Sequence, residues 1–259
     1  MITEEYVQSL SKLGKRMDGR KFDEYRNLSI EYGISKKSAE GSARVKIGET
    51  EVIAGVKLDL GEPYPDKPDQ GSIMVNVELT PLSSAKYESG PPNINAIELS
   101  RVTDRGIREC GAIDFKRLYD KASGKVWLVF IDIYPINSAG NLFDACTIAA
   151  MAAIRDAVFP SIENGKVDYS TKTKTPLPLQ KLPISCTVWK VGNELLVDPS
   201  VEEESASNSR ITVVFTEDDK ICAMQKGKDE PLLADEIEKA VELAFKTTKD
   251  IRGHFKKWT

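Results

Sequence analysis

Residues 41–60 read GSARVKIGETEVIAGVKLDL, and this stretch decides the fold of the first half of the chain. Apolar side chains occupy alternate positions along its second half, at Val52, Ala54, Val56 and Leu58. This alternation is typical of a β-strand with one buried face. Residues 48–50, Gly-Glu-Thr, supply a turn, and residues 45–47 before it are expected to form the partner strand. The stretch therefore predicts a β-hairpin.

The pattern continues to residue 160 with alternating strands and helices. Residues 72–80 and 125–134 are expected to be strands, the second ending at Pro135. Residues 95–110 have helical spacing with Asn95 as the expected N-cap, and residues 141–159 predict a buried, alanine-rich helix that Pro160 ends.

The remainder repeats this order in shorter form. Residues 160–183 are polar and lack apolar periodicity, so a linker is expected there. Strands are then predicted at 185–190, 194–197, 210–216 and 221–225, followed by an amphipathic helix at 231–251. The prediction is an α+β chain with a short leading helix and extension (1–25), a first lobe (26–160), a linker (161–183) and a second lobe that includes the C-terminal helix (184–259).

Composition narrows the function classes. The formal charge is −4, unlike a general nucleic-acid binder, so cations for RNA would have to be concentrated locally. The single histidine argues against a multi-histidine zinc centre and against Ser-His or Cys-His catalysis, and we expect no metal and no cofactor. The four widely spaced cysteines are expected to be reduced and mostly buried. No apolar run is long enough to span a membrane and the N-terminus is acidic, which indicates a cytoplasmic protein.

The first motif is RMDGR at residues 16–20, followed by Arg26. Taken alone it is equally compatible with a surface turn at Asp-Gly. Together with the hairpin at 41–50, the AIELSR segment at 96–101 and the Val-Asp-Pro segment at 197–199, however, it resembles the RNase PH family from about residue 14 to about residue 250. The resemblance implies the RNase PH-like fold, with two related β-β-α-β-α lobes of the ribosomal protein S5 domain 2-like type. It also implies an ancestry of phosphorolytic RNA cleavage.

Within that family, the chain is most similar to archaeal exosome subunits that lack catalytic activity. The segments that carry this similarity are GPP at 90–92, GNLFDA at 140–145 and EEES at 202–205. The similarity implies a hetero-hexameric ring of three pairs with the catalytic RNase PH-like subunit, together with RNA-binding cap subunits and single-stranded RNA.

Phosphorolysis needs donors that hold inorganic phosphate and cations that neutralise the RNA phosphates. Active relatives carry an arginine or several hydroxyls in the loop before the second long helix. This chain has Gly140 and Asn141 there, and Asp144 is expected to repel phosphate. Ile94 and Asn95 stand where active relatives have a pair of arginines. Two of the requirements are therefore compromised.

The third requirement is an acidic group or metal that assists the leaving oxygen. The family pattern places two aspartates six residues apart, and counting from Asp198 gives Glu204 and Arg210. A guanidinium can neither donate a proton at neutral pH nor ligate a metal. The simplest interpretation of residues 202–204 is a solvated acidic turn. We expect a non-catalytic subunit; the alternatives are an autonomous phosphate-dependent 3′-to-5′ exoribonuclease that uses Glu204, or an unrelated small-molecule enzyme.

Three arginines share one face of the helix expected at 95–110. Arg101, Arg105 and Arg108 lie at positions i, i+4 and i+7. The resemblance implies that Arg101 and Arg105 grip the RNA backbone beside the partner's active site, with Arg108 a weaker candidate. The alternative is a solvent-exposed stripe paired with neighbouring acidic residues of the same helix.

Overall fold

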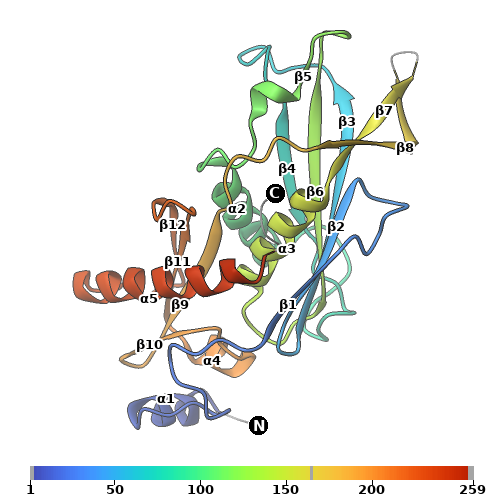
Figure 1. The fold of residues 1–259 in the computed structure, drawn as a ribbon. Coiled ribbons are helices and arrows are strands. Elements are labelled where there is room, and N and C mark those ends of the chain that lie inside the picture. Colours follow the sequence, from blue (N-terminus) through green and yellow to red (C-terminus); the bar gives the residue numbers. More distant parts are fainter. Residues whose placement is uncertain (1–2, 164–165, 256–259) are drawn as a thin grey trace.

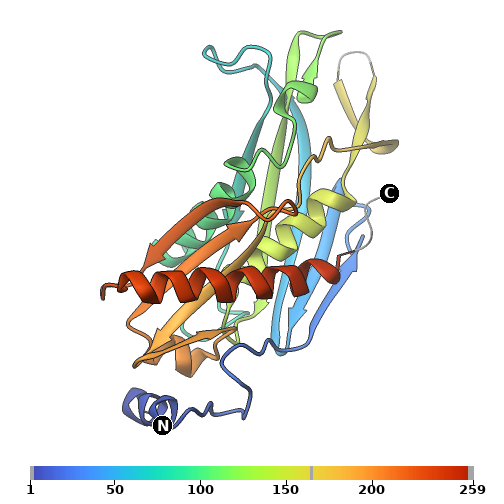
Figure 2. The same ribbon diagram turned by 60° about the vertical axis from the view of Figure 1, so that its left-hand side comes forward.

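The computed structural model describes residues 3–163 and 166–255. Two sheets share one central helix, α3 (Leu142–Asp156), and a long C-terminal helix, α5 (Ala234–Gly253), covers the second sheet. Figures 1 and 2 show α3 between the sheets and α5 lying along the sheet formed by the C-terminal strands. This arrangement confirms the expected α+β class.

The first sheet has the strand order β1-β2-β3-β6-β4, with β5 paired to β6. Only β4 and β6 run parallel; the other pairs are antiparallel. The strands are β1 (Leu28–Tyr32), β2 (Gly41–Ile47), β3 (Thr50–Gly61), β4 (Ser72–Val77), β5 (Tyr119–Asp120) and β6 (Lys125–Asn137). The helical elements of this lobe besides α3 are α2 (Ile94–Arg108) and the 3₁₀ turn η1 (Phe115–Leu118).

The second sheet is antiparallel with the order β10-β9-β11-β12. Its strands are β9 (Ile184–Val191), β10 (Glu194–Val197), β11 (Ser209–Phe215) and β12 (Ile221–Gly227). The short helix α4 (Val201–Ala206) lies between β10 and β11 and packs against the leading helix α1 (Glu4–Lys12). Both lobes therefore carry strands beyond the expected β-β-α-β-α order.

Helix α3 is buried on all sides because it packs against both sheets. Eight consecutive residues, from Ala145 to Ala152, are at most 1% exposed, and alanine predominates among them. Small side chains let the strands approach closely. A Cβ atom on Gly41, at the start of β2, would overlap the Ala153 carbonyl and the backbone of Ala157. The β2–β3 hairpin thus depends on glycine to approach α3 this closely.

Three predictions about element boundaries are wrong. Helix α2 begins at Ile94 with Asn93 as its N-cap, so Asn95 is already inside the helix. Strand β6 continues past Pro135, which is tolerated because the ladder to β3 shifts register at that point. Helix α3 ends at Asp156, before Pro160, because Ala157 adopts an extended conformation.

The segment expected to be a linker, 160–183, contains regular secondary structure. Strands β7 (Val158–Glu163) and β8 (Lys166–Pro176) form an antiparallel hairpin. The Phe159 ring anchors it to Trp127, with ring centroids 5.3 Å apart. The pairing produces little burial, so the sequence carries no alternating apolar signal.

The four cysteines are free thiols, three of them buried, as expected. Within residues 3–163 and 166–255, no helix combines the length and apolarity needed to cross a bilayer.

Candidate functional site

The RMDGR segment and Arg26 clamp a buried aspartate of the second lobe. Both oxygens of Asp198 accept hydrogen bonds from the Arg26 guanidinium, at 2.7 and 2.8 Å, and Arg20 Nη1 donates to the same carboxylate at 2.8 Å. Asp198 is fully buried and adopts a left-handed backbone with φ of +48°. The two arginines therefore fix a strained turn between β10 and α4.

Arg16 makes a second buried ion pair at the same turn. Its guanidinium donates to both oxygens of Glu203, at 2.8 and 2.6 Å, and to the carbonyls of Val197 and Asp198. Glu203 also closes a capping box at the start of α4 with Ser200. The acidic run at 202–204 is therefore not a solvated turn, and that interpretation is wrong: Glu203 is buried and paired, and Glu202 alone is exposed.

The loop before α3 contains two consecutive residues with a left-handed backbone conformation. Gly140 has φ of +94°, and a Cβ there would overlap the Pro199 carbonyl. Asn141 has φ of +60° and donates from Nδ2 to Asp198 at 3.0 Å and to Tyr25 Oη at 2.7 Å. Thr50, in the opening hairpin, donates to the Gly140 carbonyl at 2.6 Å.

Glu204 occupies the N-terminus of α3. Its Oε1 accepts the backbone N–H of Asn141 at 2.7 Å, and burial raises the pKa of its carboxyl group. A helix N-terminus favours anions because its first N–H groups lack partners within the helix. Here an internal carboxyl group takes that place.

Arg210 is the second residue of β11, and its side chain is 3% exposed. Its Nη2 pairs with Glu98 Oε1 of α2 at 2.5 Å, and its guanidinium carbon lies 3.8 Å from the centroid of the Phe143 ring. Glu204 and Arg210 both line a cleft of about 400 Å³ between α2, α3 and the second sheet. The structure thus brings together around the N-terminus of α3 the four residues expected to replace catalytic groups: Gly140, Asn141, Glu204 and Arg210.

The expectation that Asp144 repels phosphate is wrong. Asp144 is fully buried, where it accepts hydrogen bonds from Tyr25 Oη at 2.8 Å and Thr187 Oγ1 at 2.9 Å. Burial raises its pKa to about 7. The side chain ties the two lobes together and presents no charge to the cleft.

The three arginines of α2 differ in their partners. Arg101 and Arg105 are exposed, and Arg105 Nη1 donates to the neutral amide of Gln225 on β12 at 2.8 Å. Arg101 has no hydrogen bond or ion pair to any residue that the structure describes. Arg108 makes a two-point ion pair with Asp104 at 2.7 and 2.9 Å and donates to the Ile73 carbonyl. Among these three, only Arg108 therefore has its charge neutralised locally, while Glu98 pairs with Arg210 instead.

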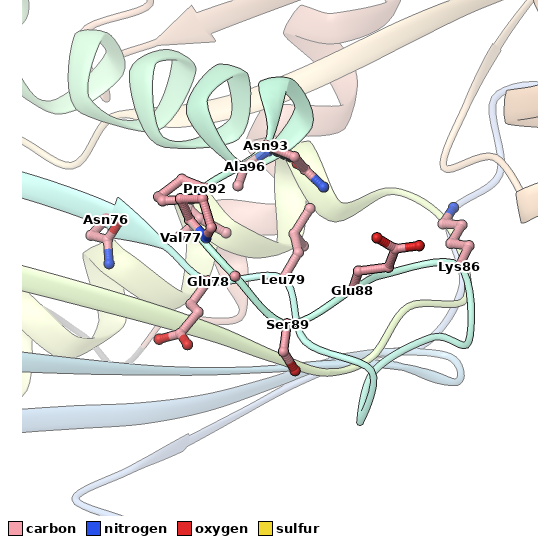
Figure 3. A pocket seen from close by; sticks show the side chains of 12 residues that line it. Asn76, Val77, Glu78, Leu79, Lys86, Glu88, Ser89, Pro92, Asn93 and Ala96 are labelled. Carbon is pink, nitrogen blue, oxygen red and sulfur yellow. Dashed lines mark hydrogen bonds between the residues drawn. The ribbon is translucent and has the colours of Figure 1, made fainter.

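A second hollow, of about 470 Å³, lies beside the N-terminus of α2 (Figure 3). Its lining includes Glu78, Glu88 and Lys86, so the carboxylates outnumber the cations. Ile94 begins the adjoining helix and is 76% exposed. This end of α2 therefore offers RNA phosphates no arginine pair.

The RMDGR motif and Arg26 were recognisable in the sequence, but their binding to Asp198 was not. It missed Tyr25, Thr50 and Thr187, whose partners lie 43 to 119 residues away along the chain. A hydroxyl in a largely apolar strand, as at Thr187 in β9, is a local signal that a buried polar network exists.

Comparison with known proteins gives a consistent result. Residues 24–160 match the model for domain 1 of the 3′ exoribonuclease family, RNase PH, and residues 181–247 match domain 2. An exosome complex component Rrp42 from Methanothermobacter thermautotrophicus is 45% identical over 94% of this chain and 90% of its own length. The protein of that name from Thermoplasma volcanium is 46% identical over 98% of this chain and 95% of its own length.

Solved structures agree with the sequence matches. A chain of the Archaeoglobus fulgidus exosome with RNA bound to the active site superposes with a TM-score of 0.89 and 42% identity, covering 98% of this chain and 97% of that one. A chain of an archaeal exosome core gives a TM-score of 0.86 and 40% identity over 98% and 96%. Rice Rrp46 is 18% identical with a TM-score of 0.69 and shares the fold.

Proposed function

The chain belongs to the 3′ exoribonuclease family of RNase PH-like proteins, and from that premise we propose that it is the non-catalytic subunit of an archaeal exosome. This complex degrades RNA from the 3′ end by phosphorolysis. The subunit shapes the active site of a catalytic RNase PH-like partner and binds the RNA backbone at the shared interface. The proposal also places it in the cytoplasm.

One observation carries the absence of catalysis. Glu204 occupies the N-terminus of α3 by accepting the Asn141 N–H at 2.7 Å. Inorganic phosphate would need this N–H group and would meet a carboxyl group already bound to it. Phosphate and the Glu204 carboxyl group would therefore compete for the Asn141 N–H group.

Arg210 supports the same conclusion from the side of the leaving group. Its guanidinium is buried and pairs with Glu98, where an active enzyme needs a carboxyl group that transfers a proton or ligates a metal. A guanidinium stays protonated at all physiological pH values and has no lone pair for a metal. The cleft therefore has a structural cation in place of an acid.

RNA binding is assigned to α2. Arg101 and Arg105 present guanidinium groups that no acidic side chain of the described residues neutralises, and such groups bind phosphates in a bidentate manner. Contacts of this kind fix the position of the backbone and read no sequence. Arg108 contributes less because Asp104 already neutralises it.

The partner is expected to cover the start of the same helix face. Ile94 and Ile97 are 76% and 44% exposed, and they precede Arg101 by seven and four residues on one stripe of α2. Leu82, in the loop before the helix, is 74% exposed. Exposed apolar side chains on one helix face, as at Ile94 and Ile97, favour a protein interface. A partner docked there would bring its active site beside Arg101 and Arg105, and three such pairs would close a hexameric ring that carries RNA-binding cap subunits.

The first test measures turnover by the purified chain. Oligo(A), phosphate and Mg²⁺ are incubated with the chain alone, with the partner alone and with the co-purified pair, and released ADP is quantified. We expect ADP from the pair and none above background from the chain alone. Release by the chain alone at a rate comparable to that of the pair, abolished by Glu204→Gln, would establish the autonomous nuclease instead.

The second test concerns the partner interface. The double variant Ile94→Asp plus Ile97→Asp should lose co-purification with the partner, because two charges would have to be desolvated in the interface. Leu233→Asp, at a position 63% exposed just before α5, is the matched control and should leave the mass of the assembly unchanged. If both variants assemble normally, the partner docks elsewhere.

A further inference from the structure

Two thiols lie where the first lobe contacts the second. Cys110 lies in the turn after α2, and Cys222 is the second residue of β12. Cys110 Sγ contacts the Ile107 carbonyl at 3.4 Å, and Cys222 Sγ contacts the carbonyl of the preceding residue, Gly106, at 3.9 Å. Each thiol is the strongest single influence on the pKa of the other. The sulfur atoms of two residues 112 positions apart in sequence therefore lie against consecutive backbone carbonyls.

The surroundings of the pair differ from those of the other cysteines. Cys146 and Cys186 are fully buried, in α3 and β9, whereas Cys222 is partly exposed and Cys110 is 6% exposed. The hydrogen bond from Cys110 lowers the pKa of the Cys222 thiol, and the nearby Lys181 ammonium acts in the same direction. Accessibility and a neighbouring cation are the features that make a thiol reactive.

We propose that Cys110 and Cys222 form an oxidisable dithiol site, which a low-molecular-weight disulfide converts into an intramolecular disulfide joining the two lobes. Cys222 is the attacking thiol because it is the one that solvent reaches. Its thiolate attacks one sulfur of the small disulfide, forms a mixed disulfide and releases one small thiol. Cys110 then loses its proton and attacks Cys222 Sγ, which releases the second small thiol. Two protein thiols are oxidised by two electrons, and the small disulfide is reduced to two thiols that take up the two protons.

The bridge would act on the same junction that carries the arginine helix. Arg105 of α2 already donates to Gln225 of β12, three residues after Cys222. A covalent link at Cys110 would hold the C-terminal end of α2 against β12. It would also close a loop of more than about 100 residues, which restricts the unfolded chain strongly. This inference does not depend on the proposed role in RNA degradation.

The decisive experiment maps the cysteines of the full chain after exposure to glutathione disulfide. Free thiols are alkylated, the protein is digested without reduction, and the peptides are identified by mass spectrometry. We expect a Cys110–Cys222 cross-linked peptide, a loss of about 2 Da from the intact protein, and alkylation of Cys146 and Cys186 only after denaturation. Four alkylatable thiols after prolonged exposure, or a different pairing, would overturn the proposal.

Two single variants test the order of the steps. In Cys110→Ser the mixed disulfide cannot resolve, so a stable glutathione adduct should remain on Cys222. In Cys222→Ser the buried Cys110 should stay unmodified over the same time. A persistent adduct on Cys222 of the wild-type chain would show that the two sulfur atoms cannot bond, and would refute the site.

Thermal unfolding supplies a readout that requires no variant. The oxidised wild-type chain should unfold at a temperature higher by roughly 5–10 °C than the reduced chain, and reduction should reverse the shift. An unchanged midpoint for a chain whose mass shows the bridge would refute the claim that the bridge holds the lobes together.

Discussion

The N-terminus of α3 and the outer face of α2 lie close together, yet their charges are arranged in opposite ways. Around α3 the charged groups have internal partners: Glu204 accepts the Asn141 N–H, Arg210 pairs with Glu98, and Asp198 receives two arginines. On α2, Arg101 and Arg105 face solvent without an acidic partner among the described residues. A site whose polar groups satisfy one another supports structure, whereas a site with unsatisfied cations is available to an anionic ligand. The contrast separates the position proposed to have lost catalysis from the proposed RNA contact.

The largest expected effect is on stability, from breaking a buried ion pair near the N-terminus of α3. Arg16→Ala should lower the free energy of unfolding by about 3–5 kcal/mol, because Glu203 would remain buried without its partner. Arg101→Ala, on the open face, should change it by less than about 0.5 kcal/mol. Urea titration of both variants measures the difference. Equal effects would erase the distinction between the two regions.

The pH dependence of stability tests the buried polar network around α3, because Asp144 belongs to it. Burial raises the pKa of this carboxyl group from 3.8 to about 7, so the folded state holds a proton that the unfolded chain releases. The contribution to stability is full below about pH 4, and it is lost as pH rises to about 7, by about 4 kcal/mol at most. Asp144→Asn cannot titrate, and its stability relative to wild type should therefore improve as pH rises across this window. A difference between the two proteins that does not vary between pH 4.5 and 7.5 would contradict the assignment.

The open face predicts a smaller effect, on binding. Arg101→Glu plus Arg105→Glu in the assembled complex should weaken binding of single-stranded RNA about 10- to 100-fold. The slope of log affinity against log salt concentration should become shallower by ~0.7 for each RNA phosphate that is no longer neutralised. Filter binding at several salt concentrations measures both quantities. Lys239→Glu plus Lys246→Glu changes the same charge on exposed positions of α5 and is the matched control. If the two double variants bind RNA equally well, the arginine row has no such role.

The smallest effect distinguishes residues within the row. Arg108→Ala should weaken RNA binding by less than about threefold, because Asp104 already neutralises that guanidinium. The separate single variant Asp104→Asn should strengthen RNA binding slightly, because it removes the carboxylate that neutralises Arg108. A loss of affinity at Arg108 as large as that at Arg101 would show that the ion pair opens when RNA binds.

Local patterns were enough to predict most strands and helices, because each has one face in a core. The alternation in β3 and the alanine-rich period of α3 are examples, and both elements lie close to the predicted ranges. The β7–β8 hairpin escaped prediction because most of its side chains are exposed. Its β signal consisted of β-favouring residues at alternate positions: Val167, Tyr169, Thr171, Thr173 and Thr175.

The sequence predicted several residues of the candidate site but not which of them bind to one another. Counting from Asp198 identified Glu204 and Arg210, and the structure places both at one cleft. The interpretation of Glu203 as solvated and of Asp144 as a repelling charge failed for one reason. Their partners, Arg16 and Thr187, are distant in sequence, and one sequence alone does not show which distant residues form ion pairs or hydrogen bonds.

The ion pair between Arg16 and Glu203 spans 187 residues, and Arg20 and Arg26 reach Asp198 across more than 170. A ribosome synthesises the three arginines more than 170 residues before their acidic partners. Until residues 198–203 have left the exit tunnel, Arg16 and Arg26 lack their acidic partners, and Arg20 has only Asp18. Completion of this junction is therefore a late, non-local step. A nascent chain interrupted before that point would lack the ion pairs that attach its N-terminal segment to the second lobe.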